Sequence, residues 1–197
     1  MISKAQTKRY HTRPSPDRRP TLNALEKGLL RWTMAERGDK VLDVNLRNGL
    51  MLESLQRERE CEVCGVSDDM EGVRESRSRL RNADILYAQR DEIPWKENTF
   101  DSVYAQVLTT PVTEPMLREM ERVLKPGGQM LVGFRTIPAP LRQVVALFRH
   151  EADDELCRPS ARARILSMMQ SLGLTQITWQ RTDLFHSVGI GWKPMEA

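Results

Sequence analysis

Short apolar segments that alternate with helical patterns are the strongest constraint on how this chain can fold. From residue 40 onward, runs rich in Val, Ile and Leu are separated by longer segments whose apolar residues recur three or four positions apart. This alternation is typical of βαβ units, in which parallel strands form a sheet with helices on both faces. The expected strands are 40–44, 61–66, 85–89, 102–105, 129–134, 176–181 and 185–192.

The helical patterns precede the first strand and fill most of the gaps between strands. We expect the first helix to follow Thr21 as its N-cap and to end near Glu36. The Lys125–Gly128 string should end a helix that starts at Pro115 and turn the chain into the next strand. Only residues 182–184 separate the last two strands, which should therefore pair as an antiparallel hairpin at the sheet edge. The other expected helices are one containing Leu52 and Leu55, then 69–80, 141–148 and 160–172.

Charge separates the first twenty residues from the rest. Residues 1–20 hold six basic side chains and one acidic side chain, a net charge of +5 in a chain whose total is +3. We predict a basic, disordered tail at 1–20 and one folded domain at 21–197, with 138–159 as a candidate substrate lid. The alternatives for the tail are contact with nucleic acid or acidic lipid, and a mitochondrial transit peptide.

The apolar runs of the sequence indicate whether the protein enters a membrane, and its cysteines indicate its redox compartment. The chain has no apolar run long enough to span a bilayer and no secretory h-region, so we expect no membrane association. Three cysteines do not suggest a disulfide framework, and we predict a cytoplasmic protein. Cys61 and Cys64 are spaced like half a zinc site, but residues three apart in a strand face opposite sides. We therefore predict no metal site.

Three strings resemble those of the class I S-adenosylmethionine-dependent methyltransferases, and in particular the branch named methyltransferase type 11. They are GDKVLDV at 38–44, IPW with NTFDSV at 93–103, and LREM with RVLKPGG at 117–128. The resemblance covers about residues 22–194. It implies a Rossmann-like, seven-stranded, mostly parallel sheet that ends in an antiparallel hairpin. It also implies S-adenosylmethionine as the cofactor and a small molecule as the methyl acceptor.

The cofactor site of such a sheet lies beyond the carboxyl ends of the strands, where the strand order reverses. The glycines of the family's Gly-x-Gly-x-Gly loop correspond here to Asn45, Arg47 and Gly49. Asn is among the residues that tolerate a positive φ, so Asn45 can keep the backbone geometry of the loop. We expect Arg47 to occupy or rim the pocket, or to pair with the methionine carboxylate of the cofactor.

Two acidic residues of the family pattern are also replaced. Ser67 stands at the position of the ribose-binding acid, with Asp68 next to it, and Gln89 stands at the adenine-binding acid. Such changes could remove on the order of 3–5 kcal/mol of cofactor binding, so we predict weakened or lost cofactor affinity. The candidate cofactor-binding residues are Asp43, Asn45, Arg47, Gly49, Ser67, Asp68, Gln89, Arg90 and Gln106.

Three functional readings follow. The first is a methyltransferase acting on a small molecule. The second is a noncatalytic relative, a binding or partner protein with the methyltransferase fold. A protein partner or a homodimer is the corresponding assembly. The third is a pocket reused for another nucleotide or an acidic ligand, with Arg47 and Arg90 as anion contacts. We expect no nucleic-acid partner. No catalytic residue is assigned, and the candidate bases are Tyr87, Tyr104, His150 and His186.

Overall fold

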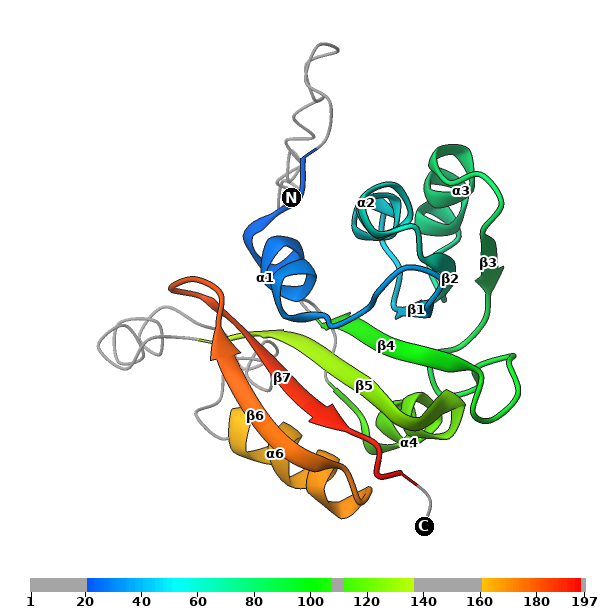
Figure 1. The fold of residues 1–197 in the computed structure, drawn as a ribbon. Helices are drawn as coiled ribbons and strands as arrows, with labels where there is room; N and C mark the ends of the chain where they lie inside the picture. Colours follow the sequence, from blue (N-terminus) through cyan, green and yellow to red (C-terminus); the bar gives the residue numbers. More distant parts are fainter. Residues whose placement is uncertain (1–20, 108–111, 137–160, 196–197) are drawn as a thin grey trace, which may run out of the picture.

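One mixed sheet organises the protein. The computed structural model describes residues 21–107, 112–136 and 161–195 (Figure 1). Its seven-stranded sheet has the order β3-β2-β1-β4-β5-β7-β6. The strands β1 to β5 pair in parallel, whereas β7 is antiparallel to both β5 and β6, which confirms the predicted fold class and the C-terminal hairpin. The strands are β1 (Lys40–Val44), β2 (Glu62–Ser67), β3 (Asp84–Tyr87), β4 (Phe100–Val107), β5 (Leu124–Arg135), β6 (Thr175–Arg181) and β7 (His186–Trp192).

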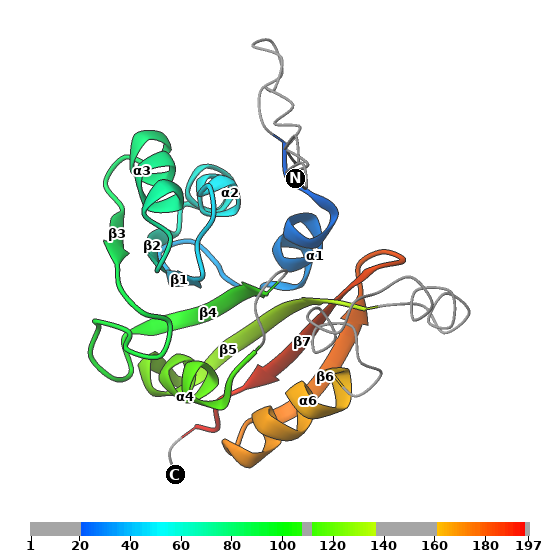
Figure 2. The ribbon, with the colours of Figure 1, turned by 180° about the vertical axis from the view of Figure 1, so that it is seen from behind.

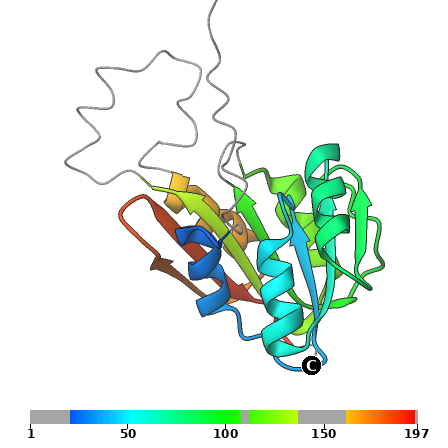
Figure 3. The same ribbon diagram turned by 90° about the horizontal axis from the view of Figure 1, so that it is seen from above.

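Helices cover both faces of this sheet. The helices α1 (Ala24–Trp32), α2 (Leu50–Arg59) and α3 (Met70–Arg79) lie on one face. The helices α4 (Glu114–Val123) and α6 (Ala161–Ser171) lie on the other, as Figures 1 and 2 show and as the view from above in Figure 3 repeats. Each face therefore buries an apolar core of its own.

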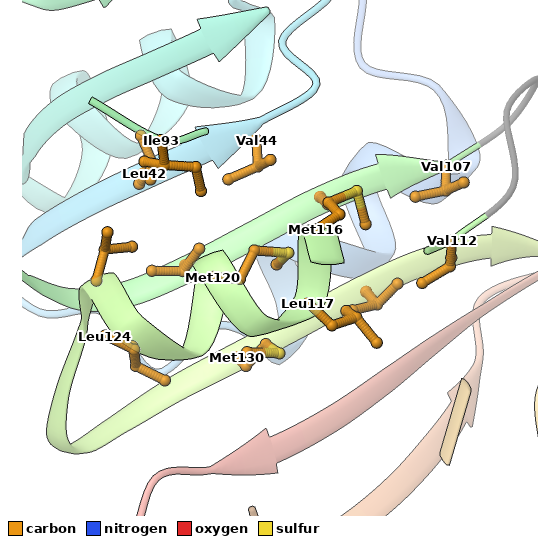
Figure 4. Close-up of a cluster of buried hydrophobic side chains, with 14 of the residues drawn as sticks. Leu42, Val44, Ile93, Val107, Val112, Met116, Leu117, Met120, Leu124 and Met130 are labelled. Carbon is orange, nitrogen blue, oxygen red and sulfur yellow. The ribbon is translucent and has the colours of Figure 1, made fainter. Parts of the chain in front are cut away.

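The two cores are separate clusters of buried side chains. Under α4, Met116, Leu117 and Met120 point toward apolar side chains of the strands, among them Leu42 and Met130 (Figure 4). The other cluster packs Val41 of β1 and Val63 of β2 against Leu side chains of α1 and α2 and against Val73 of α3. Cys64 belongs to the α4 cluster and Cys61 to the α1 cluster, so the two thiols face opposite sides of the sheet as expected.

The start of α1 differs from the prediction. The N-cap is Asn23 rather than Thr21, because Asn23 and Glu26 form a capping box. The Asn23 side chain accepts from the Glu26 N–H at 2.9 Å, and the Glu26 carboxylate accepts from the Asn23 N–H at 2.7 Å. The helix ends at Trp32, before Glu36, where Arg59 donates to the Leu30 and Thr33 carbonyl oxygens.

The Lys125–Gly128 string is the second difference. The preceding helix ends at Val123 as expected, but β5 already begins at Leu124 and includes this string. Gly127 donates to the Lys193 carbonyl oxygen, and Lys193 donates back to that of Gly128. The string is thus part of the sheet, with an irregular register against the first residues of β4.

The Arg-Glu pair of the same motif holds the loop before β4. Arg122 donates to the carbonyl oxygens of Ile93 and Trp95, each at 2.9 Å. Glu119 accepts from the Ile93 N–H at 2.9 Å and from Arg122. These residues stabilise the fold and are remote from the carboxyl edge of the sheet.

Three expectations fall on other parts of the chain. The basic tail at 1–20, the helix at 141–148 and the candidate lid at 138–159 lie outside the described residues. Among the helices that the structure does describe, none has the length and apolar character needed to cross a bilayer.

Candidate cofactor site

The sheet reverses its strand order between β1 and β4. The strands β2 and β3 follow on one side of β1, and β4 and β5 follow on the other. Val44 pairs with Val66 of β2 and with Ala105 of β4, so the carboxyl ends of these strands lie at one edge. This is the switch point at which open α/β sheets bind ligands, and it brings the predicted site residues together.

The loop after β1 keeps the backbone shape of a glycine-rich turn. Asn45 has φ 79° and Gly49 has φ 71°, so both lie in the left-handed region. The prediction that Asn45 accepts a positive φ is confirmed. The N–H groups of Asn45 and Leu46 both donate to the Val66 carbonyl oxygen, at 3.0 and 3.1 Å. The Asn45 side chain donates from Nδ2 to the Gln106 carbonyl oxygen at 2.6 Å.

Arg47 behaves differently from its neighbours in the loop. Its side chain is exposed, and within the described residues it forms no ion pair. Its backbone is packed closely, because a Cβ added at Gly72 of α3 would lie 2.5 Å from the Arg47 carbonyl oxygen. The backbone of Arg47 is thus fixed against α3, while its side chain extends into solvent.

The end of β2 offers Asp68 rather than Ser67. Ser67 is buried, and its hydroxyl accepts from the Asp69 N–H at 3.1 Å. The Asp68 carboxylate is partly exposed and lies 3.3 Å from the Arg90 guanidinium, which follows β3. Gln89 is exposed. The acidic group available at this edge is therefore displaced by one residue from the position that the family pattern gives.

A buried polar cluster underlies the site on the α1 face. It joins Glu26 of α1, Asp43 of β1, and Tyr104 and Gln106 of β4, all of them at most 2% exposed. Among the described residues, Asp43 Oδ1, the Tyr104 hydroxyl and Gln106 Oε1 have no hydrogen-bond partner of good geometry. Burial raises the pKa of Asp43 to about 8; the Tyr104 hydroxyl opposes this shift and the Glu26 carboxylate adds to it.

Sequence reasoning missed Glu26 as a member of this cluster. The signal was present, since Glu26 stands three residues after Asn23, as a capping box requires, and three and four residues before Leu29 and Leu30. The second spacing places its side chain on the apolar face of α1.

The candidate bases do not converge at the carboxyl edge. Tyr104 is fully buried under α1, and Tyr87 is 52% exposed at the end of β3. His186 pairs with Asp183 at 2.9 Å, at the turn between β6 and β7. His150 lies outside the described residues. Of these side chains, Tyr87 alone among the described residues stands at the carboxyl end of a strand. Methyl transfer from a sulfonium depends mainly on positioning, so it does not require the candidate bases to converge.

Sequence comparison gives the same family as the motifs. A family model described as a methyltransferase domain matches residues 42–132, just under half of the chain. The chain is 30% identical over 112 residues to 27-O-demethylrifamycin SV methyltransferase of Amycolatopsis mediterranei, a match that covers 52% of this chain and 41% of the relative. It is 34% identical over 122 residues to the ubiquinone/menaquinone biosynthesis C-methyltransferase UbiE of Idiomarina loihiensis, covering 55% of this chain and 48% of the relative. The chain thus spans less than half the length of these relatives.

Comparison of folds extends the likeness to most of the chain. A solved complex between the Haloferax volcanii Trm112 methyltransferase activator and a methyltransferase matches with a TM-score of 0.71. The match covers 87% of this chain and 89% of that chain at 17% identity, which shows a shared fold. The motifs, the sequence relatives and the strand order therefore agree: the chain is similar to the class I S-adenosylmethionine-dependent methyltransferases and shares their fold.

Proposed function

We propose that this protein transfers a methyl group from S-adenosylmethionine to a small molecule, and that it binds the cofactor more weakly than a family member with an intact glycine loop. The observation that carries the proposal is the left-handed backbone at Asn45, at the switch point of the sheet. The loop keeps the conformation for which glycine is normally required, although a larger side chain has replaced it.

The residues at this edge fit an adenosyl group in part. The Asp68 carboxylate would accept from the ribose hydroxyls, since an ionised carboxylate offers about four lone-pair sites and Arg90 uses only some of them. The exposed Gln89 amide would meet the adenine amino group. The left-handed backbone at Asn45 and Gly49 would lie against the rest of the cofactor. The bound cofactor supplies the electrophilic methyl group, and the protein supplies position and exclusion of water.

The weaker binding has a structural reason. Ser67 is buried and its hydroxyl accepts from the Asp69 N–H, so Asp68 is the side chain that would contact the ribose. Asp68 is already paired with Arg90 and must share its oxygens between two partners. A loss on the order of 3–5 kcal/mol would turn a micromolar site into one near a millimolar dissociation constant.

A small-molecule acceptor and a cytoplasmic location complete the proposal. The two sequence relatives are named for rifamycin SV and for ubiquinone/menaquinone biosynthesis, which supports a small acceptor. Cys61 and Cys64 are buried free thiols, which fits a reducing compartment. The structural neighbour in complex with an activator protein supports testing for a protein partner as well.

The experiment is a calorimetric titration of the full chain with S-adenosylmethionine and S-adenosylhomocysteine. We expect dissociation constants on the order of 0.1–1 mM for the wild type and about tenfold weaker binding for Asp68→Asn. Asp91→Asn is the matched control, because Asp91 is exposed and close in sequence to Arg90. No heat of binding for either compound at several millimolar would refute the proposal and favour a noncatalytic role.

A further inference from the structure

We infer that the Asn45 side chain is a further obstacle to cofactor binding, because its hydrogen bond forms a strut across the switch point that an incoming cofactor must displace. The inference rests on the proposed function and assigns part of its weak cofactor affinity, beyond the part due to Ser67 and Asp68, to one residue. It also removes Arg47 from that role.

Asn45 ties together the carboxyl ends of three strands. Its backbone N–H donates to the Val66 carbonyl oxygen of β2 at 3.0 Å. Its side-chain Nδ2 donates to the Gln106 carbonyl oxygen of β4 at 2.6 Å. The residue itself directly follows β1. The side chain therefore spans from β1 to β4, which is the place where the strand order reverses.

Glycine would leave this space open without changing the backbone. Asn45 has φ 79°, a conformation that glycine adopts at no steric cost and that Asn adopts at a modest one. The hydrogen bond to Gln106 holds the amide in place and offsets that cost. Replacement by glycine removes only the strut, and the backbone bond to Val66 remains.

A second observation points to a ligand beside the strut. Gln106 is 2% exposed, and its Oε1 is one of the buried oxygens without a partner in the part of the chain that the structure describes. The same residue supplies the carbonyl oxygen to which Asn45 is bound. Displacing Asn45 would free that carbonyl oxygen to accept a hydrogen bond from a ligand.

Arg47 provides the matched control. It stands two residues away in the same loop and also replaces a glycine of the family pattern. Its side chain is exposed, and its φ is not in the left-handed region. If the loop were obstructed by bulk in general, restoring glycine at either position would help equally. If the Asn45 side chain is the obstacle, only the glycine at position 45 should tighten cofactor binding.

The test compares wild type, Asn45→Gly and Arg47→Gly by calorimetric titration with S-adenosylhomocysteine, with thermal melts to verify folding. We expect Asn45→Gly to bind about tenfold more tightly and Arg47→Gly to stay within about twofold of wild type. Asn45→Asp serves if the glycine variant is poorly folded, because Asp tolerates the same φ but cannot donate to the Gln106 carbonyl oxygen. In 0.3 M salt, which screens the added negative charge, Asn45→Asp should also bind S-adenosylhomocysteine more tightly than wild type does.

The outcomes separate this inference from the proposed function. A wild type that binds, with Asn45→Gly and Asn45→Asp that bind equally or more weakly, would overturn the strut and leave the methyltransferase proposal standing. Equal gains in Asn45→Gly and Arg47→Gly would also overturn it. Absence of binding in all variants, each shown to be folded, would overturn both.

Discussion

Replacement of Asp43 by Asn should remove most of the pH dependence of stability between pH 5 and 8. Asp43 is 1% exposed, and its Oδ1 lacks a partner among the described residues. It stands in β1 opposite Tyr104 of β4, with Glu26 of α1 on the same covered face. Burial in these surroundings raises the pKa of Asp43 from 3.8 to about 8.

The sign of the effect follows from proton counts. Between pH 3.8 and about 8 the unfolded chain has released the Asp43 proton and the folded protein retains it. The folded state then binds more protons, so stability is complete below this range and falls as the pH rises through it, by at most about 1.4 kcal/mol per pH unit. Glu119 and Asp183 have lowered pKa values, and their opposite contribution is lost only at more acidic pH.

The assay is urea unfolding of wild type and Asp43→Asn at pH 5.5, 6.5 and 7.5. We expect the free energy of unfolding of the wild type to fall by at least about 1 kcal/mol from pH 5.5 to pH 7.5. The free energy of unfolding of the neutral, isosteric variant should hardly change over this range. Asp91→Asn, at an exposed position, should retain the wild-type slope. An equal slope in Asp43→Asn and wild type would refute the claim that Asp43 keeps its proton in the folded protein.

Three further predictions test the packing. Arg122→Ala should lower the free energy of unfolding by about 2 kcal/mol, because it frees the loop before β4, whereas the exposed Arg118→Ala should have little effect in the same denaturation assay. Gly28→Ala should lower the free energy of unfolding by about 1–3 kcal/mol, because the added Cβ would lie 2.0 Å from the Thr182 Cγ2. A melting temperature equal to that of the wild type would contradict this close contact. In a variant that keeps Cys64 as its single cysteine, thiol labelling should be slow until the protein is unfolded, because burial raises the pKa of this thiol to about 11; rapid labelling of the folded protein would show that the residue is accessible.

Much of the fold was predictable because local patterns agree with it. The bounds of β1 were predicted without error, since Gly38 and Asp39 precede the apolar run and Asn45 follows it. The start of α1 was placed wrongly because two candidate caps stand close together. The reciprocal bonds between Asn23 and Glu26 satisfy two N–H groups, which a cap at Thr21 could not match.

The candidate site was predictable at the level of the backbone only. The positive φ of Asn45 follows from residue type, because few side chains tolerate it. The partner of its side chain, Gln106, is 61 residues away and is brought near only by the pairing of β1 with β4. The ion pair between Asp68 and Arg90 likewise needs β2 and β3 side by side. Residue patterns alone do not show such contacts.

The most direct measurement is a crystal structure of the full chain grown with saturating S-adenosylhomocysteine. The account predicts ligand density at the carboxyl ends of β1 and β2, with the ribose beside Asp68 and the Asn45 side chain moved away from the Gln106 carbonyl oxygen. Density for the ligand elsewhere, or an empty edge with Asn45 still bound to Gln106, would contradict it.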